Sequence, residues 1–414
     1  MKRFAGAALP PSVYRLPLIC LLVAGLLACA RPSLTLCTDR AELAAYTSVF
    51  NASQSDYWLH IVYHPRPAEA LQDKSDADLL VGTGLSDPSL FPYLSTLSRL
   101  FRDDRIQRTD FYEDLVVLGQ QDEKTYALPL NFSLPAVVFK PQAVNENVPP
   151  LLMPLAELKR MAAAFNVEDQ EQLQSLGFSP LWYEGFLYLL AVSYGVDFRL
   201  GEGGRLEWNE ESLDRAIAEA KAWLEDAGGG VEGERAFSAK YRNAPDYRLA
   251  EEERILFYAD DIRSFLRIPR EKRESLEFRW LSHENRIPVK DDILFIGVPK
   301  RAANRKGARF FLEWLFTPEN QVKLLETNYR KRLQGVFGIA NGFSALREVN
   351  EIDLPKPQYN PLFVGAIPTE EMLLFPPALP WDWQRTRGDV IVPWLWESVS
   401  GSGTGTSLRE RLPR

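Results

Sequence analysis

Short apolar runs of strand length alternate with longer amphipathic stretches along most of this 414-residue chain. Residues 34–38, 58–63 and 78–81 have the length and composition of strands, whereas residues 40–50 place apolar side chains along one face of a helix. This alternation is typical of an α/β fold, in which helices cover a sheet. A chain of this length exceeds one ordinary hydrophobic core, so the sequence predicts two domains.

Composition excludes several classes of function. A formal net charge of −8 argues against a nucleic-acid-binding surface, which needs basic stripes. Three cysteines cannot form a disulfide-dense scaffold, and Cys37 lies in an apolar run that predicts a buried thiol. His60 and His64 alternate along a strand, which favours a solvated face over a metal site. We therefore expect no metal and no cofactor.

The first segment has the features of an export signal. Basic side chains precede an apolar run at residues 16–28, which is broken only by Pro17 and is too short to span a bilayer comfortably. The run ends in Leu-Leu-Ala-Cys at residues 26–29, which resembles a bacterial lipobox. The resemblance implies that residues 1–28 are a signal peptide and that Cys29 carries a lipid. An apolar leader that contains cysteines by chance is the alternative.

Four separate segments carry a further resemblance. Residues 124–130 read K-T-Y-A-L-P-L and precede an extended run at 135–140, and residues 293–300 precede a helix pair at 304–321 that contains F-F-L-E-W-L-F-T-P-E-N-Q. Weaker matches stand at residues 155–158 and 255–261. Together these segments resemble the extracellular solute-binding proteins of ABC importers, in particular the family 1 group that binds sugars and oligosaccharides.

The resemblance implies an α/β, two-lobed periplasmic-binding-protein fold of the type II-like class, whose lobes are joined by two or three hinge crossovers. After the signal peptide, residues 29–135 with 290–335 are expected to form the first lobe. Residues 136–289 with 336–414 are expected to form the second. In such a fold the ligand lies in the cleft between the lobes and is buried as they close, without covalent chemistry.

Seven residues are candidates for ligand contact. Two of them follow strands whose carboxyl ends should face the cleft, and a third ends a later strand. One amide stands just before a crossover, and aromatic side chains offer faces for stacking on a sugar. Polar groups at strand ends are also ordinary caps and turns, and most tryptophans are core. The candidates are Asp39, Thr83, Asn131, Trp182, Tyr183, Asp261 and Trp381.

These observations predict a monomeric, extracytoplasmic receptor that is tethered to a bacterial membrane through the lipid on Cys29. It would bind a small solute, with a sugar as the first expectation, and deliver it to ABC permease subunits. Asp260 and Asp261 depart from the family pattern, so a polyamine or another cation stays open as the ligand. A secreted glycan-acting hydrolase, or a sensor or adhesin on the same fold, are the alternatives. No Gly-x-Ser-x-Gly or His-Glu-x-x-His motif supports the hydrolase.

Overall fold

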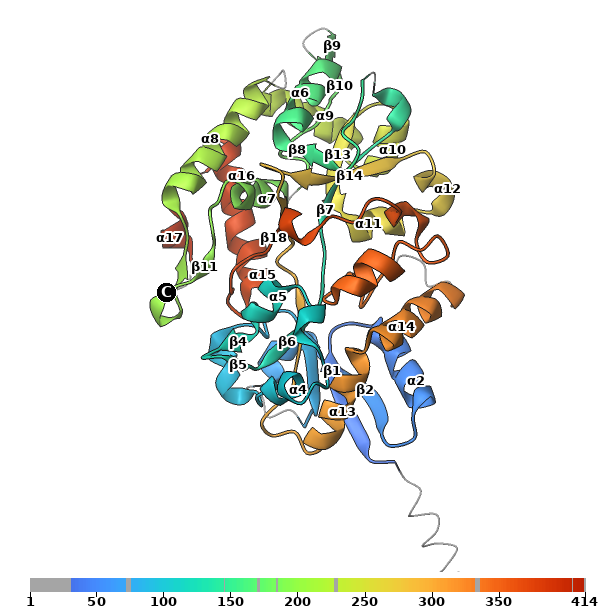
Figure 1. The fold of residues 1–414 in the computed structure, drawn as a ribbon. Coiled ribbons are helices and arrows are strands. Elements are labelled where there is room, and N and C mark those ends of the chain that lie inside the picture. Colours follow the sequence, from blue (N-terminus) through green and yellow to red (C-terminus); the bar gives the residue numbers. More distant parts are fainter. Residues whose placement is uncertain are drawn as a thin grey trace, which may run out of the picture.

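The computed structural model of the chain describes residues 31–71, 76–144, 146–169, 172–183, 185–226, 230–331, 336–403 and 405–412. The predicted signal peptide and the predicted lipidation site Cys29 lie outside these residues. Within them, two β-sheets with their surrounding helices form two lobes, one above the other in Figure 1. No helix of the described part is both long and apolar enough to cross a membrane.

The first lobe is built on a six-stranded sheet in the order β17-β6-β16-β3-β1-β2. The first three strands in the chain pair in parallel, whereas β16 runs antiparallel to both of its neighbours. Apolar runs such as Leu-Leu-Val-Gly in β3 favour central strands that are buried on both faces, with helices beside the sheet. The strands are β1 (Ser33–Thr38), β2 (Trp58–Tyr63), β3 (Leu79–Gly82), β6 (Ala127–Phe132), β16 (Leu294–Gly297) and β17 (Phe343–Ser344).

Helices α2 (Leu43–Ser53), α13 (Arg305–Leu315) and α14 (Pro318–Arg330) belong to this lobe. The side chain of Asn304 caps α13 by accepting a hydrogen bond from the Gly307 backbone at 3.0 Å. Gly307 has to be small, because an added Cβ would lie 2.6 Å from the Leu34 side chain. Cys37 is 2 % exposed, as the apolar run around it predicted.

The second lobe is built on a four-stranded sheet in the order β13-β7-β14-β8. Its longest described helix is α8 (Glu210–Asp226). Asn209 caps this helix, since its Oδ1 accepts a hydrogen bond from the Ser212 backbone at 3.0 Å. Its strands are β7 (Pro135–Phe139), β8 (Leu152–Pro154), β13 (Phe257–Asp261) and β14 (Glu277–Ser282). Its other main helices are α6 (Leu155–Phe165), α7 (Phe186–Ser193), α9 (Gly230–Tyr241), α10 (Asp246–Glu251), α11 (Ile262–Arg267) and α16 (Val392–Ser400).

Shorter elements fill the connections. Residues 115–118 are an apolar run of strand length but belong to a helix, because acidic side chains occupy the first turn of that helix, where the helix dipole favours them. The short helices are α3 (Pro67–Ala70), α4 (Ser98–Arg102), α5 (Glu113–Leu118), α12 (Arg270–Arg273), α15 (Trp383–Thr386) and α17 (Leu408–Arg411). Short strand pairs include β4 (Gln120–Gln121) with β5 (Lys124–Thr125), and β15 (Ile287–Pro288) with β18 (Leu373–Leu374).

The chain passes between the lobes more than once, so neither lobe is a continuous stretch of sequence. It crosses from β6 to β7, returns before β16, and leaves the first sheet again after β17. The first two crossovers lie side by side. Lys290 of the second crossover donates a backbone hydrogen bond to the Ser133 carbonyl of the first at 3.0 Å. Strand β17 pairs with β6, so residues 343–344 lie with the first lobe, whereas the division made from the sequence placed them in the second.

Candidate functional site

A cleft of about 370 Å³ lies where the carboxyl ends of β1 and β3 meet the segment around α15. Asp39 follows β1 and Thr83 follows β3, so the two polar side chains reach the cleft from neighbouring strands of one sheet. Trp381 lines the cleft from the segment before α15, and Asp292 lines it from the crossover that leads into β16. Three of the seven residues expected from the sequence therefore share one cleft.

Charged side chains in the cleft occur as pairs of opposite sign. Arg40 Nε lies 3.2 Å from Asp39 Oδ1, and Arg66 Nε lies 2.9 Å from Glu69 Oε2. Arg385 pairs with Asp382 at 3.0 Å on the opposite wall. Burial raises the pKa of Asp39, although the adjacent guanidinium of Arg40 works against this. Paired carboxylates and guanidinium groups present both acceptors and donors to a ligand without a net charge of their own.

Trp381 is held in position by the turn that follows β3. Its backbone N–H donates to Asp87 Oδ2 at 2.9 Å, and Asp87 is 4 % exposed. Gly84 has a φ of +76°, and a Cβ at this position would lie 2.4 Å from the Trp381 carbonyl oxygen. Only glycine allows this approach of the two backbones, so the cleft wall depends on one small residue in the first lobe.

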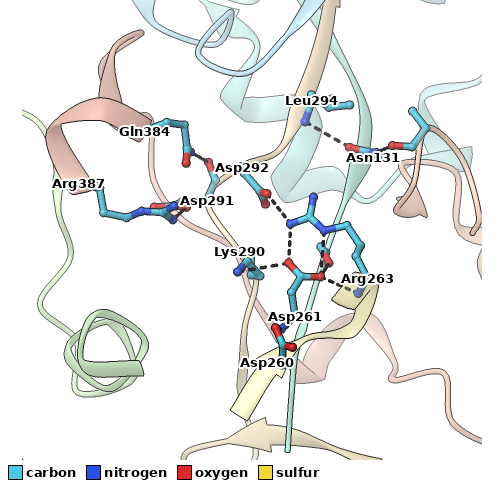
Figure 2. Close-up of polar contacts among 12 residues, drawn as sticks. Asn131, Asp260, Asp261, Arg263, Lys290, Asp291, Asp292, Leu294, Gln384 and Arg387 are labelled. Atoms are coloured by element: carbon cyan, nitrogen blue, oxygen red, sulfur yellow. Dashed lines mark hydrogen bonds and ion pairs between the residues drawn. The ribbon is translucent and has the colours of Figure 1, made fainter. Parts of the chain in front are cut away.

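A network of buried charges lies beside the cleft on the crossovers (Figure 2). Asp261 accepts from Arg263 Nε at 2.9 Å and from the Ser133 hydroxyl at 2.8 Å, and Lys290 Nζ lies 3.2 Å from it. Arg263 also forms an ion pair with Asp292. The network joins β13 and α11 of the second lobe to both crossovers, which form the hinge between the lobes.

The charges of this network keep its carboxylates ionised. Burial opposes ionisation of Asp261, but Lys290 and Arg263 outweigh it and hold the pKa of this carboxyl below its usual range. Burial likewise opposes ionisation of Asp292, and Arg263 again lowers its pKa. The neighbouring Asp260 differs, because burial raises its pKa to about 6. Asp292 Oδ1 is buried beside the cleft and has no hydrogen-bond partner among the described residues.

The structure places the other expected residues outside this cleft. Asn131 is 3 % exposed, donates to the carbonyls of Ile339 and Ala340 at 3.0 and 2.7 Å, and accepts from the Leu294 backbone at 3.3 Å (Figure 2). Its amide therefore holds the backbone at residues 339–340 and at Leu294 together near the hinge. Asp261 lies in the charge network and is not on the cleft lining.

The expected aromatic pair at residues 182–183 divides between two surroundings. Trp182 Nε1 donates to Asp246 at 2.7 Å beside a small interior cavity of the second lobe of about 10 Å³, which is room for one water. Tyr183 borders this small cavity as well, but it also lines a larger cavity of about 230 Å³ with Lys290 and Asp291, and its hydroxyl accepts from Lys290 Nζ at 3.3 Å. Tyr183 therefore faces the hinge, whereas Trp182 packs within its lobe.

Several polar residues of the cleft were not expected from the sequence. Arg66 follows β2 in a Pro-Arg-Pro segment, so the reasoning about strand ends that selected Asp39 and Thr83 would also have found it. Arg385 and Asp292 carry no such signal, because only the fold brings α15 and the crossover to the same place. No group of three or more His, Cys, Asp or Glu side chains suited to a metal ion occurs among the described residues.

Two sheets, interleaved crossovers and a cleft at the carboxyl ends of strands define a two-lobed α/β fold. No protein-family model matches this chain, and no curated protein matches it. Solved structures match it along nearly the whole length. The sugar-binding protein MalE from the phytopathogen Xanthomonas citri is 13% identical, with a TM-score of 0.67 over 92% of this chain and 94% of that one.

Two further solved structures give the same result. The cyclic alpha-maltosyl-1,6-maltose binding protein from Arthrobacter globiformis is 13% identical, with a TM-score of 0.64 over 91% of this chain and 95% of that one. The maltose-binding periplasmic protein MalE from Listeria monocytogenes is 15% identical, with a TM-score of 0.60 over 92% and 95% of the two chains. Identities this low show a shared fold alone, and the predicted two-lobed fold is confirmed.

Proposed function

We propose that this chain is a receptor that binds a sugar or short oligosaccharide in the cleft between Asp39 and Trp381 and delivers it to an ABC permease. The observation that carries the proposal is the lining of the cleft. One tryptophan, three pairs of opposite charge and the side chain of Asp292 surround a space of about 370 Å³. An indole face packs on the C–H groups of a sugar ring, while paired charges bind its hydroxyl groups.

The charge network supports a neutral ligand over a cation. The sequence left a polyamine open because of the aspartates at positions 260 and 261. In the fold, Asp261 is already neutralised by Lys290 and Arg263, and Asp260 lies away from the cleft lining. The carboxylates that do line the cleft have basic partners as well, so no cluster of uncompensated negative charge faces the ligand space.

A receptor is also preferred over a glycan hydrolase. Hydrolysis needs one protonated and one ionised carboxyl on opposite sides of the scissile bond. Asp39 and Asp292 both line the cleft, but Asp39 forms an ion pair with Arg40, and Arg263 binds Asp292. A sensor or adhesin on the same fold would bind ligand in the same cleft and differ only in its protein partner.

The place of action is part of the proposal. The lipobox at residues 26–29 supports export and a lipid on Cys29, which would hold a monomeric receptor at the outer side of a bacterial membrane. Radiolabelled palmitate fed to expressing bacteria should label the wild-type protein and not the variant Cys29→Ser. Equal labelling of both proteins would rule out the lipid on Cys29.

Isothermal titration calorimetry with a sugar panel tests ligand binding. The panel starts from maltose and cyclic alpha-maltosyl-1,6-maltose, which similar structures bind or are named for, and includes spermidine as a cation. We expect one sugar to bind, and Trp381→Ala to weaken it about tenfold or more. Trp58→Ala is the matched control, since Trp58 is 52 % exposed and lies outside the cleft.

Three outcomes would contradict the proposal. Binding of spermidine without binding of any sugar would show that the ligand is a cation. Release of shorter products from a bound oligosaccharide, abolished by Asp39→Asn, would make the protein a hydrolase. Equal loss of sugar affinity in the Trp381 and Trp58 variants would move the binding site away from the cleft.

A further inference from the structure

A patch of basic side chains covers the end of the first lobe at which the described chain begins. Residues 300–309 contain five Lys or Arg and no acid, in a chain whose formal net charge is −8. Four of these five side chains are exposed, as is Arg31. We name this patch the basic pole; it consists of Arg31, Lys300, Arg301, Arg305, Lys306 and Arg309.

Specific contacts hold the parts of the basic pole together. Asn304 Nδ2 donates to the Ser33 carbonyl at 3.4 Å, and the Asn304 backbone donates to Asp78 Oδ1 at 2.7 Å. The Arg305 guanidinium donates to the Lys300 carbonyl. The start of α13 is therefore fixed against the start of β1, and Figure 1 shows both at the lower end of the molecule.

An exposed tryptophan lies at the same end. Trp58 opens the edge strand β2, its side chain is 52 % exposed, and its backbone donates to the Pro32 carbonyl at 3.0 Å. The preceding Tyr57 packs on Phe310 of α13 with 5.3 Å between ring centroids. Tryptophan beside basic residues is typical of surfaces that lie at a membrane interface, because its ring is apolar and its N–H is polar.

Few carboxylates offset the charge of this surface. Asp78 is 4 % exposed and is used by two backbone N–H groups, those of Thr35 and Asn304. Asp56, which precedes Tyr57, is exposed, and so is Asp76, two residues before Asp78. The amino end of α13 adds the positive end of a helix dipole to the six basic side chains. The surface is thus complementary in charge to an anionic partner.

We propose that the basic pole is a docking surface for the anionic headgroups of a lipid bilayer. The apolar run at residues 16–28 and the lipobox cysteine immediately precede Arg31 in the sequence, so a membrane attachment there would bring this end of the protein to the bilayer. Basic residues at an anionic surface add to such an attachment and orient the protein on it. With this end of the first lobe on the membrane, the second lobe points away from the bilayer. This inference does not rest on the ligand proposed above.

Vesicle co-sedimentation of the unlipidated chain from residue 31, which contains every described residue, tests the proposal. Vesicles of phosphatidylcholine alone are compared with vesicles in which about a third of the lipid is phosphatidylglycerol. We expect binding to the anionic vesicles only, weakened by salt. Replacing Lys300, Arg301, Arg305 and Lys306 by Gln should lower the affinity about 100-fold or more. The matched control replaces four exposed bases elsewhere by Gln, namely Arg99, Arg102, Arg270 and Lys272.

Each outcome decides the proposal. Binding that survives in the control variant and is lost in the basic-pole variant supports it, provided that both variants have the circular dichroism spectrum of the wild type. Equal loss in both variants would show attraction by overall charge and would overturn it. Absence of binding by the wild-type chain to anionic vesicles would overturn it too. A variant Trp58→Ser should weaken binding several-fold at high salt, where headgroup attraction is screened.

Discussion

Two tryptophans separated by a single residue have different surroundings in this protein. Trp383 is 2 % exposed, and its indole N–H donates to Asp291 on the crossover, so it belongs to the core. Trp381 is only partly buried and lines the cleft. The difference arises from the backbone, since Asp87 binds the Trp381 N–H and the helix α15 begins at Trp383. At the residue scale, the side of one short turn that a side chain occupies decides whether it lines the cleft or joins the core.

Glu234 on α9 is a buried carboxyl that makes stability depend on pH. Burial raises its pKa to about 8 from an ordinary 4.5, and the hydrogen bond from the Ser179 hydroxyl only partly offsets this. Between these values the folded protein keeps a proton that the unfolded chain has lost. The free energy of unfolding therefore falls as pH rises through this window, by about 2–5 kcal/mol.

The variant Glu234→Gln removes this dependence while keeping the size of the side chain. Urea unfolding should show the variant more stable than wild type at about pH 9 and similar to it at about pH 5. Glu232→Gln is the control, because it removes the same charge from an exposed position of the same helix. A stability difference for Glu234→Gln that does not change with pH would contradict the prediction.

We expect Asn131 to stabilise the fold and not to contact the ligand. Its amide serves three backbone groups near the hinge, and Asn131→Ala would leave them buried without partners. We expect a loss of about 2–4 kcal/mol in the free energy of unfolding, with the sugar affinity of the folded protein unchanged. Asn320→Ala removes two hydrogen bonds of a half-buried side chain on α14, one to the Trp314 carbonyl and one from Lys323, and should cost less, about 1 kcal/mol. A large drop in sugar affinity for Asn131→Ala would contradict this prediction and indicate that Asn131 contacts the ligand.

At the scale of elements, the turn after β3 positions the wall of the cleft. Gly84→Ala should cost about 1 kcal/mol for the positive φ and about 2 kcal/mol more, because the added Cβ meets the Trp381 carbonyl. Gly365→Ala is the matched control, since Gly365 has a φ of +68° and no atom within 4 Å of an added Cβ. Calorimetry should show weaker sugar binding for the Gly84 variant alone. Unchanged binding in both variants would show that the Trp381 segment is not held by this turn.

The same turn shows how far sequence reasoning reaches. Chain length predicted two domains, and the family resemblance implied two lobes. The strand pattern placed Asp39 and Thr83 at strand ends, because local periodicity indicates which residues end a strand. Trp381 was selected as an aromatic in a Pro-rich loop, and the fold brings it to the same cleft. Arg385 and Asp292 could not be selected, since their position depends on long-range packing of α15 against the crossover. Asp261 was predicted from its strand end, but the sequence could not show that Arg263 and Lys290 surround it.

At the scale of the whole molecule, the two lobes share one hydrophobic core at the hinge. Trp280 on β14 of the second lobe packs on Phe343 of the first, with 5.8 Å between ring centroids, and its indole N–H donates to the Ala366 carbonyl at 2.7 Å. Phe278 and Phe363 complete the cluster. A closing motion of the lobes would pivot about these aromatic rings, because they are the packed contact that both sheets share.

This arrangement predicts that the protein unfolds as one unit. Each lobe is assembled from separate stretches of chain, so neither can fold before the crossovers are in place. Urea unfolding followed by far-UV circular dichroism and by tryptophan fluorescence should give one coincident transition. A saturating sugar at about 100 times its dissociation constant should add about 2.7 kcal/mol to the whole transition. The Trp381→Ala variant, at the same sugar concentration, should unfold in one transition with a much smaller shift. Two separate transitions, or a ligand shift confined to one of them, would show that the lobes are independently stable and that the shared aromatic core contributes little to joining them.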